Sequence, residues 1–197
     1  MPPLVAYHKT PVPPSGSSHA LACHLTSPDD LPLRHGQRFL SHLITARDSV
    51  LHVWALVESA TDRAQPTASL HHLKTRRVLG TVTSLSRVRT LASKADGCDR
   101  ILVSFSDAKM SLMEWSQDDH DLLPVSLHTF EKLPQVADDR PTLLATDPSS
   151  RMTVLLLPTN SGGDGTLAIL PFFTEELDLE GLGMDREGWD RVGGEGS

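Results

Sequence analysis

Cysteine, aromatic side chains and long apolar runs are all scarce in this chain of 197 residues. Two cysteines, Cys23 and Cys98, are too few for a disulfide framework, and this scarcity is typical of reducing compartments such as the cytosol or nucleus. No stretch approaches the ~20 consecutive apolar residues that a membrane-spanning helix needs. The first residues, MPPLVAYHKTPVPPSG, lack the charged start and apolar core of a signal peptide. These absences predict a soluble intracellular protein without membrane contacts.

Positive charge is also in short supply, and it is unevenly distributed. The formal net charge is -7, and residues 175–197 alone carry eight acidic and two basic residues. This balance argues against nucleic-acid binding by the whole chain, because phosphate contacts need a basic face. The run from residue 71 to residue 94 is an exception, since it contains no acid. We expect a solvated face there, and the alternative is a nucleic-acid contact through Lys74, Arg76, Arg77, Arg87, Arg89 and Lys94.

Short apolar runs with strand spacing follow one another from residue 37 to residue 173. The first two, FLSHLITA and SVLHVWALV, flank a compact turn at Arg47–Asp48, and the second shows the alternation typical of a strand. Residues 59–75 are polar, contain Pro66 and are predicted to form a loop. Gly80 predicts a bulge or a sharp bend in the run that follows. Later runs bring the total to about eight strands, and no segment is a convincing helix.

The stretch ILVSFSDAKMSLMEWS, residues 101–116, predicts a tight hairpin. Ile101, Val103 and Phe105 would lie on one side of its first strand. Asp107 suits the turn, because its side chain can accept hydrogen bonds from backbone N–H groups two residues on. This hairpin predicts shape rather than chemistry.

Several strands are apolar on both faces, as in TVLLLP and LAIL, which indicates sheets covered on two sides. Among sandwiches, barrels and propellers, this pattern favours sheets stacked like propeller blades. We therefore predict an all-β fold, a partial β-propeller of about two antiparallel blades over residues 37–173. Residues 1–36 are proline-rich and are expected to be mostly irregular, with one short extended segment near Leu21–Leu25. Residues 174–197 are acidic and glycine-rich and are expected to be disordered.

Motifs for phosphate or metal binding are weak. SGGDGT lacks the lysine and the following helix of a P-loop, so we interpret it as a hairpin connection. His19, Cys23 and His24 lie close together in sequence, but no second Cys/His pair stands at zinc-finger spacing. We therefore expect no cofactor and no metal site.

Catalytic motifs are equally weak. No GxSxG elbow would expose a serine nucleophile, and paired carboxylates such as Asp118–Asp119 fall in polar, turn-like segments. We expect no catalytic residues and no small-molecule substrate. Trp54 and Trp115 each close a strand run, where tryptophan usually packs at a core edge or an interface.

Residues 102–115, LVSFSDAKMSLMEW, resemble part of the N-terminal propeller of the largest subunit of the cleavage and polyadenylation specificity factor. In that family an apolar strand ends in Ser-Phe, Asp-Ala-Lys follows, and the next strand ends in Glu and an aromatic residue. The matching residues here are Ser104, Phe105, Asp107, Ala108, Lys109, Glu114 and Trp115. The later run HDLLPVSLHTFE resembles the family's His-Asp-Leu and Ser-Leu-His-x-Phe-Glu at His120, Asp121, Leu122, Ser126, Leu127, His128, Phe130 and Glu131. LITARDSVLHVWAL, DPSSRMTVLLL and TLAILPF extend the resemblance over about residues 37–173.

The resemblance implies a non-enzymatic nuclear scaffold for pre-mRNA 3′-end formation. Its partners would be other subunits of a cleavage and polyadenylation complex, and because family members leave signal reading and RNA cleavage to other subunits, RNA contact would be indirect. The same architecture occurs in the large subunit of the UV-damaged-DNA-binding complex and in a large splicing-factor subunit, which are alternatives. The Ser-Leu-His-x-Phe-Glu run favours the polyadenylation member. Family proteins are far longer, so we expect a fragment or truncated gene model with an uncovered sheet face.

Two functions of other classes stay open. A nucleic-acid-binding module using residues 71–94 would show affinity that falls steeply with added salt. A small hydrolase would need two carboxylates, or a nucleophile and a base, converging in one concave pocket. For the scaffold, the loop predicted at residues 59–75 is our candidate for a protein-binding segment.

Overall fold

The structure of the chain is a computed structural model that describes residues 16–31, 33–59, 67–106, 108–129, 142–157 and 166–172, without the side chain of Lys94. This part of the chain is almost entirely β-structure. Its elements are β1 (His19–Cys23), η1 (Pro28–Asp30), β2 (Gln37–Arg47), β3 (Val50–Ser59), β4 (Thr67–Arg77), β5 (Val82–Val88), α1 (Leu91–Asp96), β6 (Arg100–Phe105), β7 (Lys109–Ser116), β8 (Asp121–Thr129), β9 (Leu143–Thr146), β10 (Met152–Leu157) and β11 (Thr166–Pro171).

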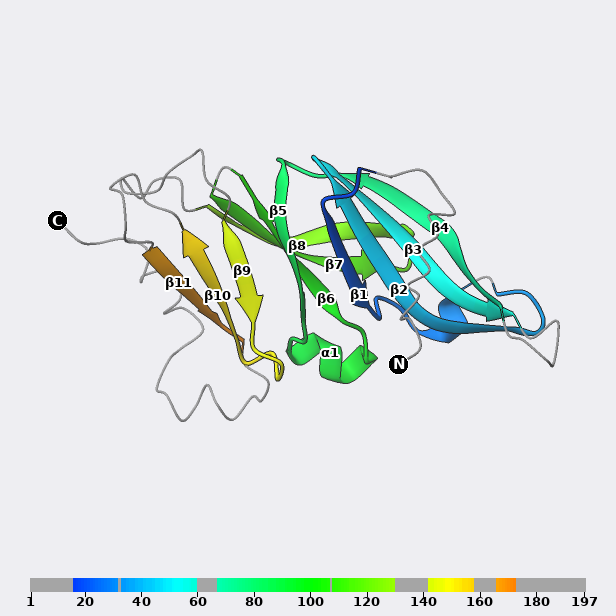
Figure 1. Ribbon diagram of the computed structural model, residues 1–197. Coiled ribbons are helices and arrows are strands. Elements are labelled where there is room, and N and C mark those ends of the chain that lie inside the picture. Colours follow the sequence, from blue (N-terminus) through cyan, green and yellow to red (C-terminus); the bar gives the residue numbers. More distant parts are fainter. Residues whose placement is uncertain are drawn as a thin grey trace, which may run out of the picture.

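The strands form three antiparallel sheets that stand side by side in chain order (Figure 1). The first sheet has the order β1-β2-β3-β4, the second β5-β6-β7-β8, and the third β11-β10-β9. The predicted all-β fold is confirmed, and the arrangement is consistent with part of a β-propeller. About eight strands in about two blades were predicted, whereas the described residues form eleven strands in three sheets.

The largest hydrophobic core lies between the first and second sheets. Strand β3 alternates buried and half-buried residues, which is why its apolar set can face one neighbour. Both sheets contribute buried side chains to this core: Cys23, Leu25, Ile44, Ala46, Leu51 and Val53 from the first, and Val82, Ile101, Val103, Phe105, Met113 and Leu122 from the second and its margins.

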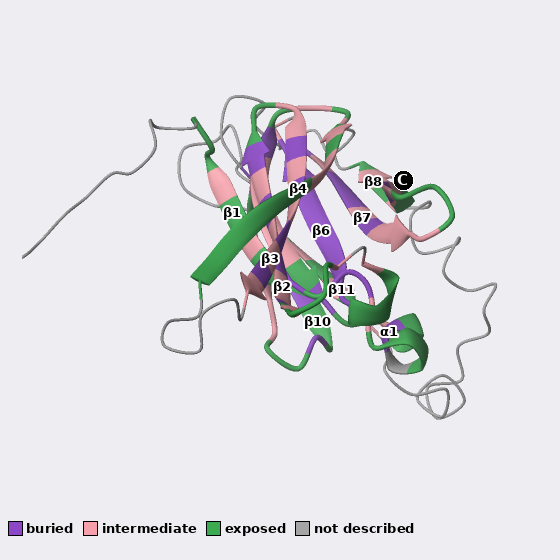
Figure 2. Cartoon of the chain, turned by 90° about the vertical axis from the view of Figure 1, so that its right-hand side faces the viewer, coloured by how far each residue is buried: buried purple, intermediate pink, exposed green. Residues whose placement is uncertain are grey.

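The second sheet is covered on both faces. All six residues of β6 are buried, and Figure 2 shows this strand in the buried colour along its length. Ile101, Val103 and Phe105 pack toward the first sheet, whereas Leu102 joins a cluster that includes Leu170 of the third sheet. The predicted hairpin is therefore confirmed, and so is the prediction that Ile101, Val103 and Phe105 share one side of its first strand. The two-sided covering predicted from TVLLLP and LAIL is wrong for those strands, because Leu156, Leu167 and Ile169 are exposed. Asp107, predicted to make the turn, lies outside the described residues.

A seam of hydroxyl groups joins the second sheet to the third. Thr83 Oγ1 lies 3.0 Å from Ser104 Oγ and 2.9 Å from Thr142 Oγ1. Ser86 Oγ donates to Thr146 Oγ1 at 2.6 Å. Buried hydroxyls need partners, and these residues supply one another. The interface between these two sheets therefore carries specific pairing beside its apolar contacts.

The loop predicted at residues 59–75 is wrong for residues 67–75. They belong to β4, which pairs with β3 from Ser59↔Thr67 to Val50↔Arg77. This strand is the edge of the first sheet and most of its residues are exposed, so backbone pairing forms it without an apolar stripe in its sequence. Residues 60–66 lie outside the described part of the chain.

Two other details concern breaks in the strands. Around Gly80 the chain makes a sharp bend, the second of the two expected alternatives, and β5 begins only at Val82. The short helix α1 was not predicted. Its first turn is closed where the Thr90 N–H donates to Ser93 Oγ at 3.0 Å, and Gly97 ends it with a φ of 70°. Glycine favours that left-handed conformation.

Strand β1 matches the extended segment expected near Leu21–Leu25, and it pairs with β2 from His19↔Ala46 to Cys23↔His42. Residues 19–23 thus join the first sheet although they precede residue 37. Residues 1–15 and the tail 174–197, expected to be irregular or disordered, lie outside the described residues. In the part of the chain that the structure covers, neither helix is long and apolar enough to cross a membrane.

Candidate functional site

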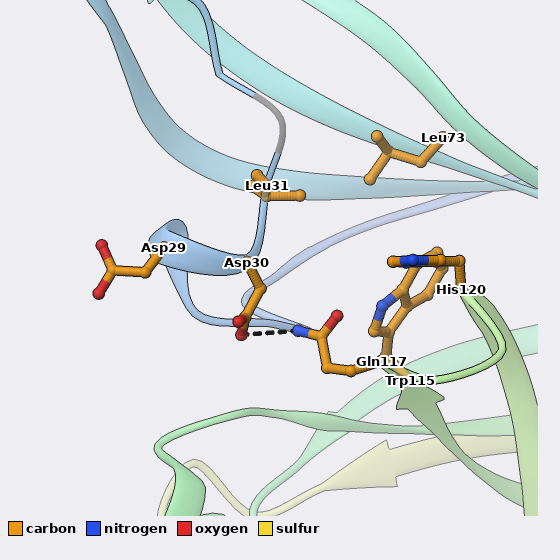
Figure 3. A pocket seen from close by; sticks show the side chains of 7 residues that line it. All are labelled: Asp29, Asp30, Leu31, Leu73, Trp115, Gln117 and His120. Atoms are coloured by element: carbon orange, nitrogen blue, oxygen red, sulfur yellow. Dashed lines mark hydrogen bonds between the residues drawn. The ribbon is translucent and has the colours of Figure 1, made fainter.

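A groove of about 490 Å³ opens where η1 and the edge of the first sheet meet the β7–β8 turn of the second. We call it the rim groove. Such a volume falls within the range of ~300–1,000 Å³ typical of ligand pockets. Its lining residues come from three segments of the chain that are far apart in sequence (Figure 3): Asp29, Asp30, Leu31, Leu73, Trp115, Gln117 and His120.

One hydrogen bond connects two of the segments that line the rim groove. Gln117 Nε2 donates to Asp30 Oδ2 at 2.7 Å, which ties the η1 segment to the β7–β8 turn (Figure 3). Trp115 and His120 lie together on one side, and Leu31 and Leu73 on another. His120 has a φ of 46° and thus adopts the left-handed backbone conformation at the end of the β7–β8 turn. The groove thus combines an aromatic wall, two leucines and acidic groups.

A smaller cavity of about 150 Å³ shares Asp30, Trp115 and Gln117 with the rim groove. Arg100 lines this cavity and forms ion pairs with two acidic side chains. Its guanidinium contacts Asp96 Oδ2 at 2.7 Å and Glu114 Oε2 at 3.3 Å. The hydrogen bond from Arg100 is the main cause that lowers the pKa of Asp96, and the pKa of Arg100 is raised in return. Glu114 is therefore a partner in an ion pair that joins β6 to β7.

The basic run does not form one surface. Lys74 and Arg76 in β4 both reach Asp121 Oδ2, at 3.5 Å and 2.8 Å. Arg77 is exposed and lines a separate hollow of about 120 Å³. Lys94 lies in α1, and its side chain is outside the described residues. Of the six candidate nucleic-acid contacts, the structure thus brings Lys74 and Arg76 together around a carboxylate.

Arg87 and Arg89 meet at another carboxylate, Asp99, whose side chain is fully buried. Arg89 Nε donates to Asp99 Oδ1 at 3.0 Å, and Arg87 Nη1 lies 4.0 Å from Oδ2. The backbone N–H of His24 donates to Oδ2 at 2.8 Å. Asp99 therefore links the end of β1 to the end of β5 and holds both arginines in the fold.

The residues of HALACH point to structural roles. Cys23 is buried, and burial, with Asp99 as a smaller cause, raises the pKa of its thiol to about 12. His19 Nδ1 lies 2.9 Å from Ser18 Oγ, and the His24 ring contacts Phe39 edge-on. Within the described residues, no group of three or more His, Cys, Asp or Glu side chains is placed to hold a metal ion.

Trp54 and Trp115 occupy different settings. Trp54 lies in β3 on the side of the first sheet opposite its core, where its Nε1–H donates to Thr45 Oγ1 at 3.1 Å. His72 packs edge-on against it, with ring centroids 4.8 Å apart. Trp115 packs partly buried against the main core and also lines the rim groove. The expectation that they lie at a core edge or an interface holds for Trp115.

The outer face of the third sheet is apolar throughout. Opposite residues of paired antiparallel strands share a face. Pairings such as Leu156↔Leu167 and Leu156↔Leu143 define the face turned away from the cores, which we call the outer apolar face. It consists of Leu143, Ala145, Met152, Val154, Leu156, Leu167, Ile169 and Pro171. Leu167 and Ile169 are each 62% exposed and Leu143 is 56% exposed. Contiguous exposed apolar surface of this kind is uncommon on soluble monomeric proteins.

No protein-family model matches the chain. Protein CFT1 of Coccidioides immitis is 32% identical over 188 residues, which is 85% of this chain and 12% of that protein. The protein of the same name in Aspergillus niger is 32% identical over 190 residues, 88% of this chain and 12% of its own length. In Neurospora crassa, Protein cft1 is 39% identical over 119 residues, 56% of this chain and 7% of the relative.

This chain is similar to proteins named CFT1. The similarity extends over most of its length in the first two relatives, of which it spans 12%. This similarity supports the resemblance to the largest subunit of the cleavage and polyadenylation specificity factor that was found over about residues 37–173.

Sequence reasoning missed the rim groove and both carboxylate clusters. Asp121 lies 45 residues from Arg76, and Asp99 lies 75 residues from His24. Pairings of such separation leave no local pattern. The apolar runs TVLLLP and LAIL did indicate strands, but only the register shows which residues share the outer face.

Proposed function

We propose that this chain is a non-enzymatic scaffold subunit of a nuclear cleavage and polyadenylation complex, and that it acts in mRNA 3′-end formation through contacts with other protein subunits. The similarity to proteins named CFT1 and the resemblance of residues 102–131 to the largest subunit of the cleavage and polyadenylation specificity factor support the pathway. The outer apolar face supports the mode of action.

The outer apolar face is the observation that carries the proposal. It has no charged or polar side chain, and five of its residues are large and exposed: Leu143, Met152, Leu156, Leu167 and Ile169. Burying apolar area yields about 25 cal/mol per Å², so a partner that covers this face gains stability by doing so.

A further antiparallel sheet is the occupant that fits this face. The three sheets already stack in series, and the second sheet is covered on both sides by apolar faces of its neighbours. Sheets stack face to face about 10 Å apart with interdigitating side chains. The third sheet continues the series and offers the same kind of surface, which suits an apolar sheet of a partner subunit.

The charged groups support a structural rather than a catalytic role. Asp99, Asp121 and Glu114 are each engaged with arginine side chains that belong to other strands or their ends. These contacts join segments of the fold. A hydrolase would instead need such groups directed at a shared substrate position.

The test is purification of a tagged chain from nuclear extract, followed by identification of its partners by mass spectrometry. We expect subunits of the cleavage and polyadenylation complex with the wild type, and their loss with the double variant Leu167→Lys, Ile169→Lys. Leu70→Lys is the matched control, because Leu70 is also an exposed strand leucine, at 50%, but lies on the first sheet.

Retention of secondary structure by each variant would be checked by circular dichroism. The proposal fails if the wild type brings down none of these subunits. It also fails if the folded double variant brings down the same subunits as the wild type.

A further inference from the structure

We propose that the rim groove binds an arginine side chain presented by an extended segment of a partner protein. The inference rests on the proposed scaffold function only in assuming a protein partner, and its site is separate from the outer apolar face. The groove is lined by residues of η1, β4 and the end of β7 with its following turn.

Charge selects a cationic occupant. Asp29 and Asp30 line the rim groove, and no lysine or arginine does. The adjacent turn carries Asp118 and Asp119, which are both exposed and lie outside the groove lining. Asp30 uses Oδ2 to accept from Gln117, and a carboxylate can accept further hydrogen bonds through its other oxygen. A positive group entering the groove therefore meets a carboxylate whose position is already fixed.

The walls select a planar, long side chain. Trp115 offers an aromatic surface on the far side of Gln117 from Asp30 (Figure 3), and a guanidinium packs well over tryptophan. Leu31 and Leu73 lie across the groove, where they can cover the methylene stem. Arginine is favoured over lysine, because its flat fork can stack on a ring and donate to a carboxylate at the same time.

The continuation of the groove supports a peptide rather than a free small molecule. The smaller cavity shares Asp30, Trp115 and Gln117 with the rim groove and runs on toward Asp96 and Glu114. The two hollows together follow the edge between the first and second sheets. An extended chain can place one side chain in the larger hollow while its neighbours lie along the smaller one.

The experiment follows the tryptophan indole N–H signals of the full ¹⁵N-labelled chain by NMR. The probe is the blocked peptide Gly-Ser-Arg-Ser-Gly, and the signal of Trp115 is assigned with Trp115→Phe. We expect saturable movement of the Trp115 signal with about millimolar affinity, as befits a small ligand, and a steady Trp54 signal. The same peptide with citrulline, a neutral isostere of arginine, should leave Trp115 unmoved.

Asp30→Asn tests the carboxylate without removing the hydrogen bond that connects the two segments, because the asparagine oxygen can still accept from Gln117. We expect about fivefold or more weaker binding, since a charge-assisted hydrogen bond is replaced by a neutral one. Asp48→Asn, at an exposed turn, is the matched control and should bind as the wild type does. Equal responses to arginine and citrulline, unchanged affinity in Asp30→Asn, or no movement of Trp115 would each overturn the inference.

The two proposals can fail separately. The variant Leu167→Lys, Ile169→Lys should bind the arginine peptide normally even where it loses the complex. Conversely, Asp30→Asn should keep the contacts of the outer apolar face.

Discussion

At the scale of single residues, His42 has an unusual setting for an imidazole. It is fully buried, its Nδ1 accepts from the Leu25 N–H at 3.1 Å, and its Nε2 has no partner among the described residues. Burial, with His24 as a smaller cause, lowers the pKa of His42 from 6.5 to about 4. The fold therefore holds this imidazole neutral.

This pKa shift predicts how stability depends on pH. Unfolded His42 takes up a proton near pH 6.5 and folded His42 only near pH 4, so its contribution is complete above pH 6.5 and is lost as the pH falls toward 4. Linkage limits the loss to about 3 kcal/mol. Urea unfolding should show that His42→Asn, whose oxygen can accept from Leu25, loses stability less steeply in this window than the wild type. His35→Asn, in an exposed turn, should keep the wild-type slope, and an unchanged slope in His42→Asn would contradict the prediction.

At the scale of elements, two carboxylates connect strands that the backbone ladder does not pair, and Asp99 is fully buried whereas Asp121 is partly buried. Asp99 receives the backbone of His24, next to β1, and the side chain of Arg89, next to β5. Asp121 forms ion pairs with Lys74 and Arg76, and these contacts join β4 to β8. Edge strands of neighbouring sheets are thus held in place by side chains, and most of the basic run is used for this purpose.

Asp99→Ala should lower the free energy of unfolding by about 1–3 kcal/mol, because it leaves the part-buried N–H of His24 without its acceptor. The lower part of this range is expected if the half-exposed arginines regain water. Urea denaturation followed by tryptophan fluorescence measures the change. Asp119→Ala, on an exposed turn, serves as the control with a change within about 0.5 kcal/mol. A loss no larger than that of the control would mean that Asp99 is dispensable.

At the scale of the whole molecule, the two ends of the stack of sheets differ. The first sheet ends in a face with Trp54, His72 and Thr75, where rings and hydroxyls contact one another. The third sheet ends in the outer apolar face. We therefore expect a protein partner to bind at the third sheet, through apolar contacts rather than through the net charge of the chain.

Because four basic side chains of the run 71–94 are paired with carboxylates, we predict that the chain binds nucleic acid weakly and with little dependence on salt. Six phosphate contacts to a single strand would reduce affinity on the order of a hundredfold between 50 and 200 mM salt. We expect no such fall for a labelled oligouridine in fluorescence anisotropy, because Lys74, Arg76, Arg87 and Arg89 already face carboxylates. Asp121→Asn should raise the affinity by releasing two of these cations. A steep salt dependence of the wild type would instead favour the nucleic-acid-binding alternative.

Local sequence determined the elements whose signals are contained in a few residues. Strand geometry can be predicted locally from three features: the alternation around Val53, the turn at Asp48 and the apolar stretch Ile101–Phe105. The same stretch carried the family resemblance. Strand β4 was not predicted because its sequence is polar and its strand conformation depends on backbone pairing with β3. Helix α1 was not predicted because six residues are too few to show a helical repeat of apolar residues.

Tertiary structure alone decided the sites. Asp121 lies 45 residues from its partner Arg76, and Asp99 lies 75 residues from His24, whose backbone it accepts from. Three distant segments assemble the rim groove. Strand register decides which apolar residues are buried and which form the outer apolar face. Because side chains alternate, every strand has two faces. Which of the two faces is exposed to solvent depends on the neighbouring sheet, and no single segment of the sequence contains that information.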